Sequence, residues 1–118
     1  MAFSPCTVHG GGFSGGASTF FPALVRGTER FSIRHKACPA DATKFHEWAV
    51  DHLSLVSEGE TFFPQTQPSA CALAGDDLVD PFAFFLNEYL RGEPARQFYG
   101  QVCAKCAPAV AEDWMIPW

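Results

Sequence analysis

The hydrophobic pattern near the N-terminus predicts a β-hairpin. Residues 20–35 read "FFPALVRGTERFSIRH", in which Phe31 and Ile33 alternate with Ser32 and Arg34. Alternation with a period of two is typical of a half-buried strand, and the polar "RGTE" between two apolar runs is typical of a turn. We therefore expect strand, turn and strand over residues 20–35.

The pattern then changes to helical spacing. Asp41 is a suitable N-cap and Gly59 a suitable stop, so we expect a helix between these two residues. Its apolar residues recur every three or four positions and fall on one face. This face carries Phe45, Trp48, Ala49, Leu53 and Val56, with His52 in the middle of the apolar stripe.

A second helical pattern occupies "DPFAFFLNEYLRG". Asp80 is a suitable N-cap, Pro81 is favoured at the first helical position, and Gly92 lies past the expected end. The expected buried stripe is Phe82, Phe85, Leu86, Tyr89 and Leu90. Residues 93–100 predict a further short turn of helix, and the last twelve residues predict at most a short helix followed by an apolar tail. Prolines interrupt residues 60–75, where we expect a loop or short extended pieces.

Length and composition indicate one folded domain. The chain has 118 residues, of which 47% are hydrophobic and 18% charged, and its twelve Phe and three Trp supply a large apolar surface for one core. Residues 1–19 are rich in Gly and Ser and are expected to form a flexible lead. The prediction is a small single α+β domain over residues 20–118, with an N-terminal β-hairpin and two or three helices.

Charge argues against a nucleic acid as partner, and the lack of a long apolar run argues against a membrane. The formal net charge is −5 and the pI is near 5.2, whereas phosphate contacts need clustered Lys and Arg. Only Arg30, Arg34, His35 and Lys36 come close to a basic patch. The N-terminus resembles no signal peptide and no apolar run is long enough to span a bilayer, so we expect a cytoplasmic protein whose five cysteines stay reduced.

Two short motifs predict a metal site. His35 and Cys38 have the same spacing as Cys103 and Cys106, so H-x-x-C and C-x-x-C together supply a Cys₃His ligand set. Such a set is common in structural zinc sites, and zinc would staple the domain at these two turns. Residues 39–102 separate the halves, a longer insert than in ordinary zinc ribbons. Replacement ligands remain open, namely Cys6, Cys71, His46 and His52.

A closed tetrahedral site leaves no position for a substrate, and no other polar set converges in the sequence. We therefore expect no enzyme activity. The prediction is a small protein-binding module, an adaptor, assembly factor or inhibitor, including a virus-encoded inhibitor of host machinery. The alternatives are a metal- or thiol-dependent redox enzyme using "CAKC", and a zinc-knuckle nucleic-acid binder.

The C-terminal "EDWMIPW" is a candidate surface for a protein partner or a second copy of the chain. Its apolar residues are Trp114, Met115, Ile116 and Trp118. Tryptophan and methionine are enriched where protein interfaces gain most of their affinity. The alternative is that this tail folds back and fills the core, because monomers rarely expose such a patch.

Overall fold

The structure is a computed structural model that describes residues 4, 5, 12, 13 and 18–118. Ser4–Pro5 (β1) and Gly12–Phe13 (β2) pair antiparallel. The flexible lead over residues 1–19 lies mostly outside the described residues, and its last two residues, Ser18 and Thr19, belong to the first long strand. The division at residue 19 stays a prediction.

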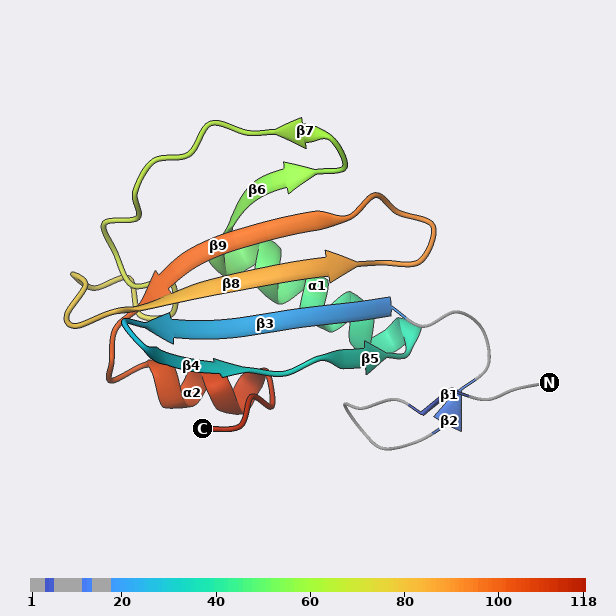
Figure 1. The fold of residues 1–118 in the computed structure, drawn as a ribbon, viewed down its shortest axis with the longest axis horizontal. Helices are drawn as coiled ribbons and strands as arrows, with labels where there is room; N and C mark the ends of the chain where they lie inside the picture. Colours follow the sequence, from blue (N-terminus) through green and yellow to red (C-terminus); the bar gives the residue numbers. More distant parts are fainter. Residues whose placement is uncertain (1–3, 6–11, 14–17) are drawn as a thin grey trace.

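One antiparallel sheet forms the frame of the molecule. Its strands run in the order β4-β3-β8-β9-β6-β7, and β5 pairs with the first residues of β3 (Figure 1). The strands are β3 (Ser18–Arg26), β4 (Glu29–Ser32), β5 (His35–Ala37), β6 (Ser54–Glu58), β7 (Thr61–Phe62), β8 (Phe82–Tyr89) and β9 (Arg96–Val102). The sheet brings residues from both halves of the chain side by side, with β3 directly against β8.

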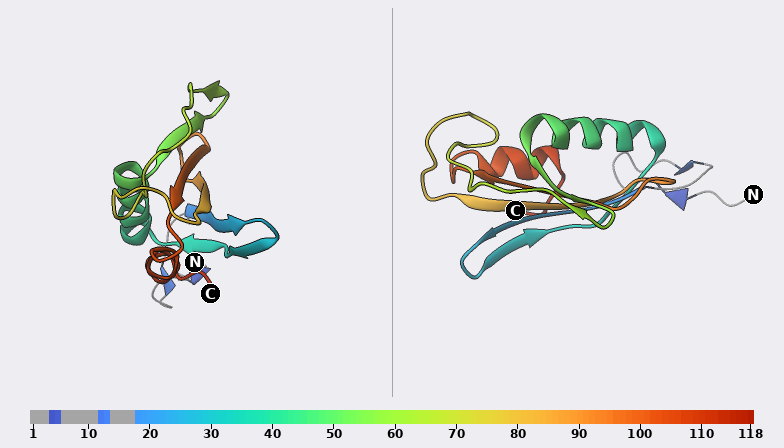
Figure 2. Two further views of the ribbon diagram at one scale, coloured as in Figure 1. Left: turned by 90° about the vertical axis from the view of Figure 1, so that its left-hand side faces the viewer. Right: turned by 90° about the horizontal axis from the view of Figure 1, so that it is seen from above.

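Two helices cover one face of this sheet, as Figure 2 shows in its right-hand view. They are α1 (Pro39–His52) and α2 (Ala107–Asp113). The core lies between the helices and the sheet, where Phe20, Leu24, Phe84 and Trp114 are fully buried. Among the described residues, neither helix is long and apolar enough to cross a membrane.

The hairpin predicted over residues 20–35 is confirmed. Residues 23–26 of β3 pair with β4, and Gly27 has a φ of 60° in the turn that joins them. Glycine adopts this left-handed conformation without the steric cost that a side chain brings. After Ser32 the chain continues into β5, which extends the pairing with β3 at His35.

The first helix is confirmed in place, but both of its predicted ends are wrong. The N-cap is Cys38, and the predicted cap Asp41 lies in the first turn of the helix. Helix α1 stops at His52, and Leu53 is extended with ψ of 164°. Residues 54–58 form β6, which pairs with β9, so the backbone groups of this segment are satisfied by a neighbouring strand. Gly59 has a φ of 59° and lies in the turn between β6 and β7.

The predicted second helix is wrong, because residues 82–89 form strand β8. Phe82, Phe84 and Leu86 point to the helices, while Phe85 and Tyr89 point to the opposite face. A strand usually alternates apolar buried residues with polar exposed ones. These outward aromatic residues and the buried Glu88 break that alternation, so the sequence resembles the apolar stripe of a helix. This segment forms a strand because it pairs with β3 on one side and with β9 on the other.

The short helical turn predicted over residues 93–100 is also wrong, since Arg96–Val102 is β9. A Cβ at Gly100 would lie 2.6 Å from Leu53 Cδ2, so the strand passes close to the residue that follows α1. The fold is thus a small α+β domain, mostly sheet with two helices.

Candidate functional site

The first pair of predicted zinc ligands lies where β5 meets α1. His35 is buried, and its Nε2 donates a hydrogen bond to the carbonyl oxygen of Trp114, which places the proton on that nitrogen. The Cys38 thiol donates to Asp41 Oδ2 at 3.1 Å. Both side chains therefore have partners inside the fold.

The second pair lies at the opposite end of the sheet. Cys103 follows β9 and Cys106 precedes α2, and Figure 1 places this junction far along the sheet from the junction of β5 and α1. In the described part of the chain, no group of three or more His, Cys, Asp or Glu side chains is positioned to hold a metal ion. The fold does not show the zinc staple, which stays a prediction.

The alternative ligands are dispersed. His46 pairs with Glu88 at 2.7 Å, and His52 stacks on Trp48 with ring centroids 4.3 Å apart. Cys6 lies outside the described residues. Cys71, in contrast, lies directly beside the second cysteine pair.

Three thiols gather where β9 passes into α2. Cys71, Cys103 and Cys106 are all buried. The backbone N–H of Cys103 donates to Cys71 Sγ at 3.4 Å, and the N–H groups of Leu73 and Ala74 also point to this sulfur. The Cys106 thiol lies near enough to Cys71 to help lower the pKa of that group.

These surroundings give the thiols of Cys71 and Cys106 different pKa values. Burial disfavours a charged Cys71, but the backbone N–H groups of three residues overcome it and lower the pKa of Cys71 from 9.0 to about 7. Burial raises the pKa of Cys106, as does its hydrogen bond to Cys71. The negative charge of the pair therefore resides on Cys71.

We predict that the thiolate absorbance of Cys71 appears with a midpoint near pH 7. A folded-state pKa below the unfolded value means that this group stabilises the fold fully at pH values above the unfolded value of 9.0. That contribution is lost as the pH falls through about 7. The measurement is an ultraviolet titration of the protein minus that of Cys71→Ser. Cys103→Ser is the control, because its backbone N–H remains, and a midpoint at the ordinary value would contradict the prediction.

A second buried cluster lies between α1 and the sheet. Glu88 is fully buried on β8, with its Oε1 bonded to His46 and its Oε2 3.6 Å from Arg96 Nη1. Burial opposes the charge of Arg96, but its hydrogen bonds to Glu58 and Glu93 raise the pKa of the guanidinium. The positive charge of Arg96 thus offsets the negative charges of three carboxylates, of which that of Glu88 has no access to water. We interpret this cluster as a structural charge network.

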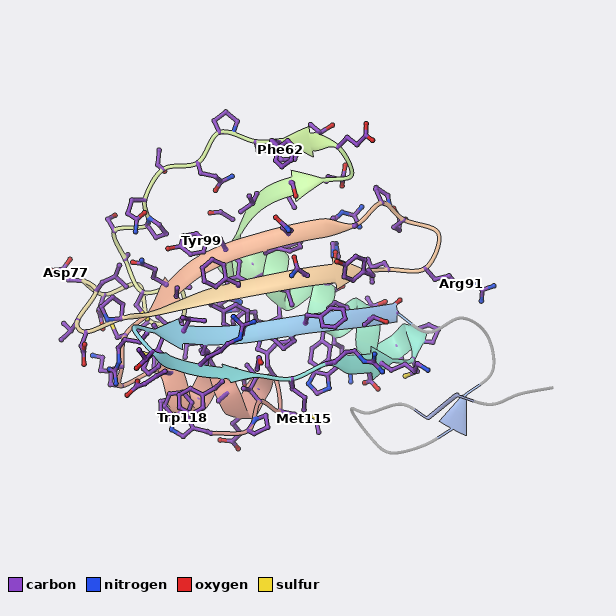
Figure 3. The ribbon with its side chains drawn as sticks, viewed as in Figure 1. Phe62, Asp77, Arg91, Tyr99, Met115 and Trp118 are labelled. Atoms are coloured by element: carbon purple, nitrogen blue, oxygen red, sulfur yellow. The ribbon has the colours of Figure 1, made fainter. Side chains whose placement is uncertain are left out.

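The C-terminal residues divide between the core and the surface. Trp114 and Ile116 are buried, whereas Met115 and Trp118 are exposed (Figure 3). Trp114 stacks on Phe45 with ring centroids 4.5 Å apart. The tail therefore fills the core with its first tryptophan, and a docking role for the four residues together stays a prediction.

The face of the sheet opposite the two helices, here called the open face, carries side chains that the sequence pattern predicts in other elements. Residues directly opposite each other on paired strands point to the same face, so Phe85 and Tyr99 lie together with ring centroids 5.2 Å apart. Phe21 and Tyr89 form a second pair at 5.7 Å. In the view of Figure 3 the strands lie in front of α1, so Tyr99 is seen on this open face.

Two adjoining hollows follow these aromatic pairs. One has a volume of about 550 Å³ and the other about 470 Å³, and they share Arg30, Phe85 and Asn87. Gln97 and Tyr99 line the first, and Phe21, Arg34 and Tyr89 the second. Their described lining contains no carboxylate, although the chain has more acidic than basic residues. Arg30 and Arg34 have no ion-pair partner among the described residues.

Sequence reasoning missed this surface because Phe85 and Tyr89 were assigned to a helix stripe. The signal that identifies it is the period-two pattern of β9, where Gln97, Tyr99 and Gln101 alternate with Phe98, Gly100 and Val102. A strand of this kind has one buried face and one face turned to solvent.

Comparisons of the chain with protein-family models, with curated proteins and with solved structures give no match.

Proposed function

We propose that this protein is a non-catalytic protein-binding module, acting as an adaptor, assembly factor or inhibitor, and that the open sheet face binds an acidic segment of its partner. One observation carries the proposal: the adjoining hollows combine exposed aromatic rings with two arginines that have no ion-pair partner among the described residues, and no described carboxylate lines them.

The chemistry of this face suits an acidic peptide. Phe85 and Tyr89 are 46% and 47% exposed, which is unusual for large rings unless another surface covers them. Tyrosine and arginine are over-represented among the residues that dominate interface affinity. Arg30 and Arg34 would pair with carboxylates, and the amides of Asn87 and Gln97 would hydrogen-bond the peptide backbone.

Charge favours a protein segment over a nucleic-acid strand. A nucleic acid requires several phosphate contacts, whereas this face has two arginines without an ion-pair partner in the described part of the chain, and the whole chain carries a net charge of −5. The expected structural zinc is a separate matter, because the proposed contacts do not involve the cysteines. Elemental analysis, which measures the zinc content per chain, tests whether the predicted zinc is bound.

The test uses a fluorescein-labelled synthetic peptide in which Glu alternates with Tyr and Leu, with binding followed by fluorescence anisotropy. We expect Arg30→Gln and Phe85→Ser each to weaken binding by about tenfold, the effect of removing one interface anchor. Lys44→Gln and Val50→Ser on the exposed side of α1 are the matched controls and should bind as the unaltered protein does.

Three results would overturn the proposal. The first is equal affinity for the variants and the unaltered protein. The second is tighter, salt-dependent binding of an oligothymidylate strand, which would favour the nucleic-acid alternative. The third is a concentration-dependent dimer in sedimentation that Phe85→Ser abolishes, which would assign the face to a second copy of the chain.

A further inference from the structure

Strand β4 forms one edge of the sheet, and in the described part of the chain no strand pairs with its outer side (Figure 1). The opposite edge ends in β7, which is two residues long and is followed by Phe63 and Pro64. A short strand and a proline protect an edge from further pairing, because proline has no N–H to donate. Residues 29–34 contain no proline, so an added strand can pair with them.

The register of β4 shows which of its backbone groups face outward. The N–H of Ile33 donates to the carbonyl oxygen of Pro22 at 3.3 Å, so these two residues are a hydrogen-bonded pair. Hydrogen-bonded and non-hydrogen-bonded pairs alternate along an antiparallel ladder, and Ser32 is the next residue, opposite Ala23. The N–H and C=O groups of Ser32 therefore point away from β3, and by the same alternation so do those of Arg30.

The side chains along this edge differ in character on the two faces of the sheet. Arg30, Ser32 and Arg34 line the second hollow on the open face. Phe31 lies toward the helices, where its ring centroid is 4.6 Å from that of the exposed Trp118. A strand added at this edge would therefore meet two arginines on one of its faces and aromatic rings on the other.

We propose that part of the partner's acidic segment binds as an added antiparallel strand along β4, next to the part that lies in the hollows. This inference rests on the proposed function, because it states how the same segment is held. In strand addition, main-chain hydrogen bonds supply affinity and alternate side chains supply specificity. A residue that exchanges hydrogen bonds with Arg30 turns its side chain to the same face as Arg30, so this position suits an acidic residue. The intervening apolar residues would lie beside Phe31 and Trp118.

Charge favours an acidic segment over a second copy of this chain. If two copies of β4 paired antiparallel about a two-fold axis, Arg30 and Arg34 of both copies would lie on the same face of the joined sheet. Like charges at neighbouring cross-strand positions are destabilising. An acidic strand instead meets two arginines that have no ion-pair partner among the described residues.

The experiment compares two N-methylated versions of the labelled Glu/Tyr/Leu peptide, with binding to the unaltered full chain followed by fluorescence anisotropy. One version is methylated on the backbone nitrogens of its Glu residues, whose N–H groups face β4 in the proposed pairing. The other is methylated on the Tyr and Leu nitrogens, whose N–H groups point away from the sheet. We expect the first to bind about tenfold more weakly than the unmethylated peptide and the second to bind as tightly.

Ser32→Pro tests the same pairing from the side of the protein. It removes the outward N–H and leaves the pairing of β4 with β3 intact, because an edge strand tolerates proline where the nitrogen faces solvent. We expect about fivefold weaker binding of the unmethylated peptide. Ser32→Ala is the matched control, since it keeps the N–H and should bind as the unaltered protein does.

Equal affinity of the two methylated peptides would overturn the added strand. Weaker binding of the Tyr/Leu version alone would overturn it too, because that pattern requires parallel pairing. In either case a loss of affinity in Phe85→Ser would still support the proposed function, because β3 separates Phe85 on β8 from the edge. The expected methylation pattern without that loss would contradict the occupation of the hollows alone. The peptide comparison uses the unaltered protein, so it stands even if Ser32→Pro fails to fold.

Discussion

Replacing Arg96 by Met is expected to destabilise the protein by about 3–5 kcal/mol, the usual cost of removing one partner of a buried ion pair. Glu88 is fully buried, and Arg96 Nη1 is the guanidinium nitrogen facing its Oε2 at 3.6 Å. Arg96 also bonds Glu58 at 2.7 Å and Glu93 at 3.3 Å, so its loss leaves three carboxylates together without their shared cation. Chemical denaturation at neutral pH measures the change in the free energy of unfolding.

Two variants show whether the buried charge is the cause. Adding Glu88→Leu to Arg96→Met should restore most of the stability, because an apolar side chain then occupies the space of the uncompensated carboxylate. Arg91→Met removes an exposed arginine from the turn between β8 and β9 and should change stability by less than about 0.5 kcal/mol. If the double variant were as unstable as Arg96→Met alone, lost packing of the guanidinium stem would be the explanation instead.

Replacing Trp114 by Ala should destabilise the protein by about 3–5 kcal/mol, as expected for a large aromatic side chain in a core. Trp114 is fully buried and lies against Phe20, Phe45, Trp48 and Phe84. Its carbonyl oxygen also accepts the hydrogen bond from His35, so the cavity opens beside a buried polar contact. Thermal unfolding followed by near-ultraviolet circular dichroism reports the loss directly.

Trp118→Ala is the matched control for this prediction. Trp118 is 53% exposed and lies beside Phe31 and Phe82, with ring centroids 4.6 and 5.2 Å away, so its loss should cost about 1 kcal/mol or less. Equal destabilisation by the two substitutions would contradict the division of the tail between core and surface. It would also reopen the interpretation of the tail as one docking element.

The assignment of β8 shows why the sheet was only partly predictable. Phe82, Phe85, Leu86 and Tyr89 satisfy helical spacing as well as any true helix of this length, and Asp80 with Pro81 imitates a helix start. In the fold Asp80 has a φ of 49° and its carboxylate pairs with Arg26 at 2.7 Å. A local pattern cannot distinguish these outcomes, because the hydrogen bonds that stabilise a strand come from segments remote in sequence.

The candidate sites were predictable to different degrees. The sequence singled out Cys103 and Cys106 by their spacing, and both belong to the thiol cluster. Their partner Cys71 has no spacing signal, because the contact forms only when the segment 64–81 folds over the start of α2. His35 was singled out as well, but its ring nitrogen bonds the Trp114 carbonyl at the other end of the sheet.

Local sequence was enough to predict one α+β domain with one core, the N-terminal hairpin, the place of α1 and the short C-terminal helix, because each depends on turn residues and periodicity within a few positions. Three features could be seen only in the folded molecule: Phe82–Tyr89 and Arg96–Val102 are strands, Glu88 is buried beside Arg96, and Phe21, Phe85, Tyr89 and Tyr99 share an open face. Each of these depends on pairing between segments far apart in the chain. The free energy of such contacts appears only when both partners are in place.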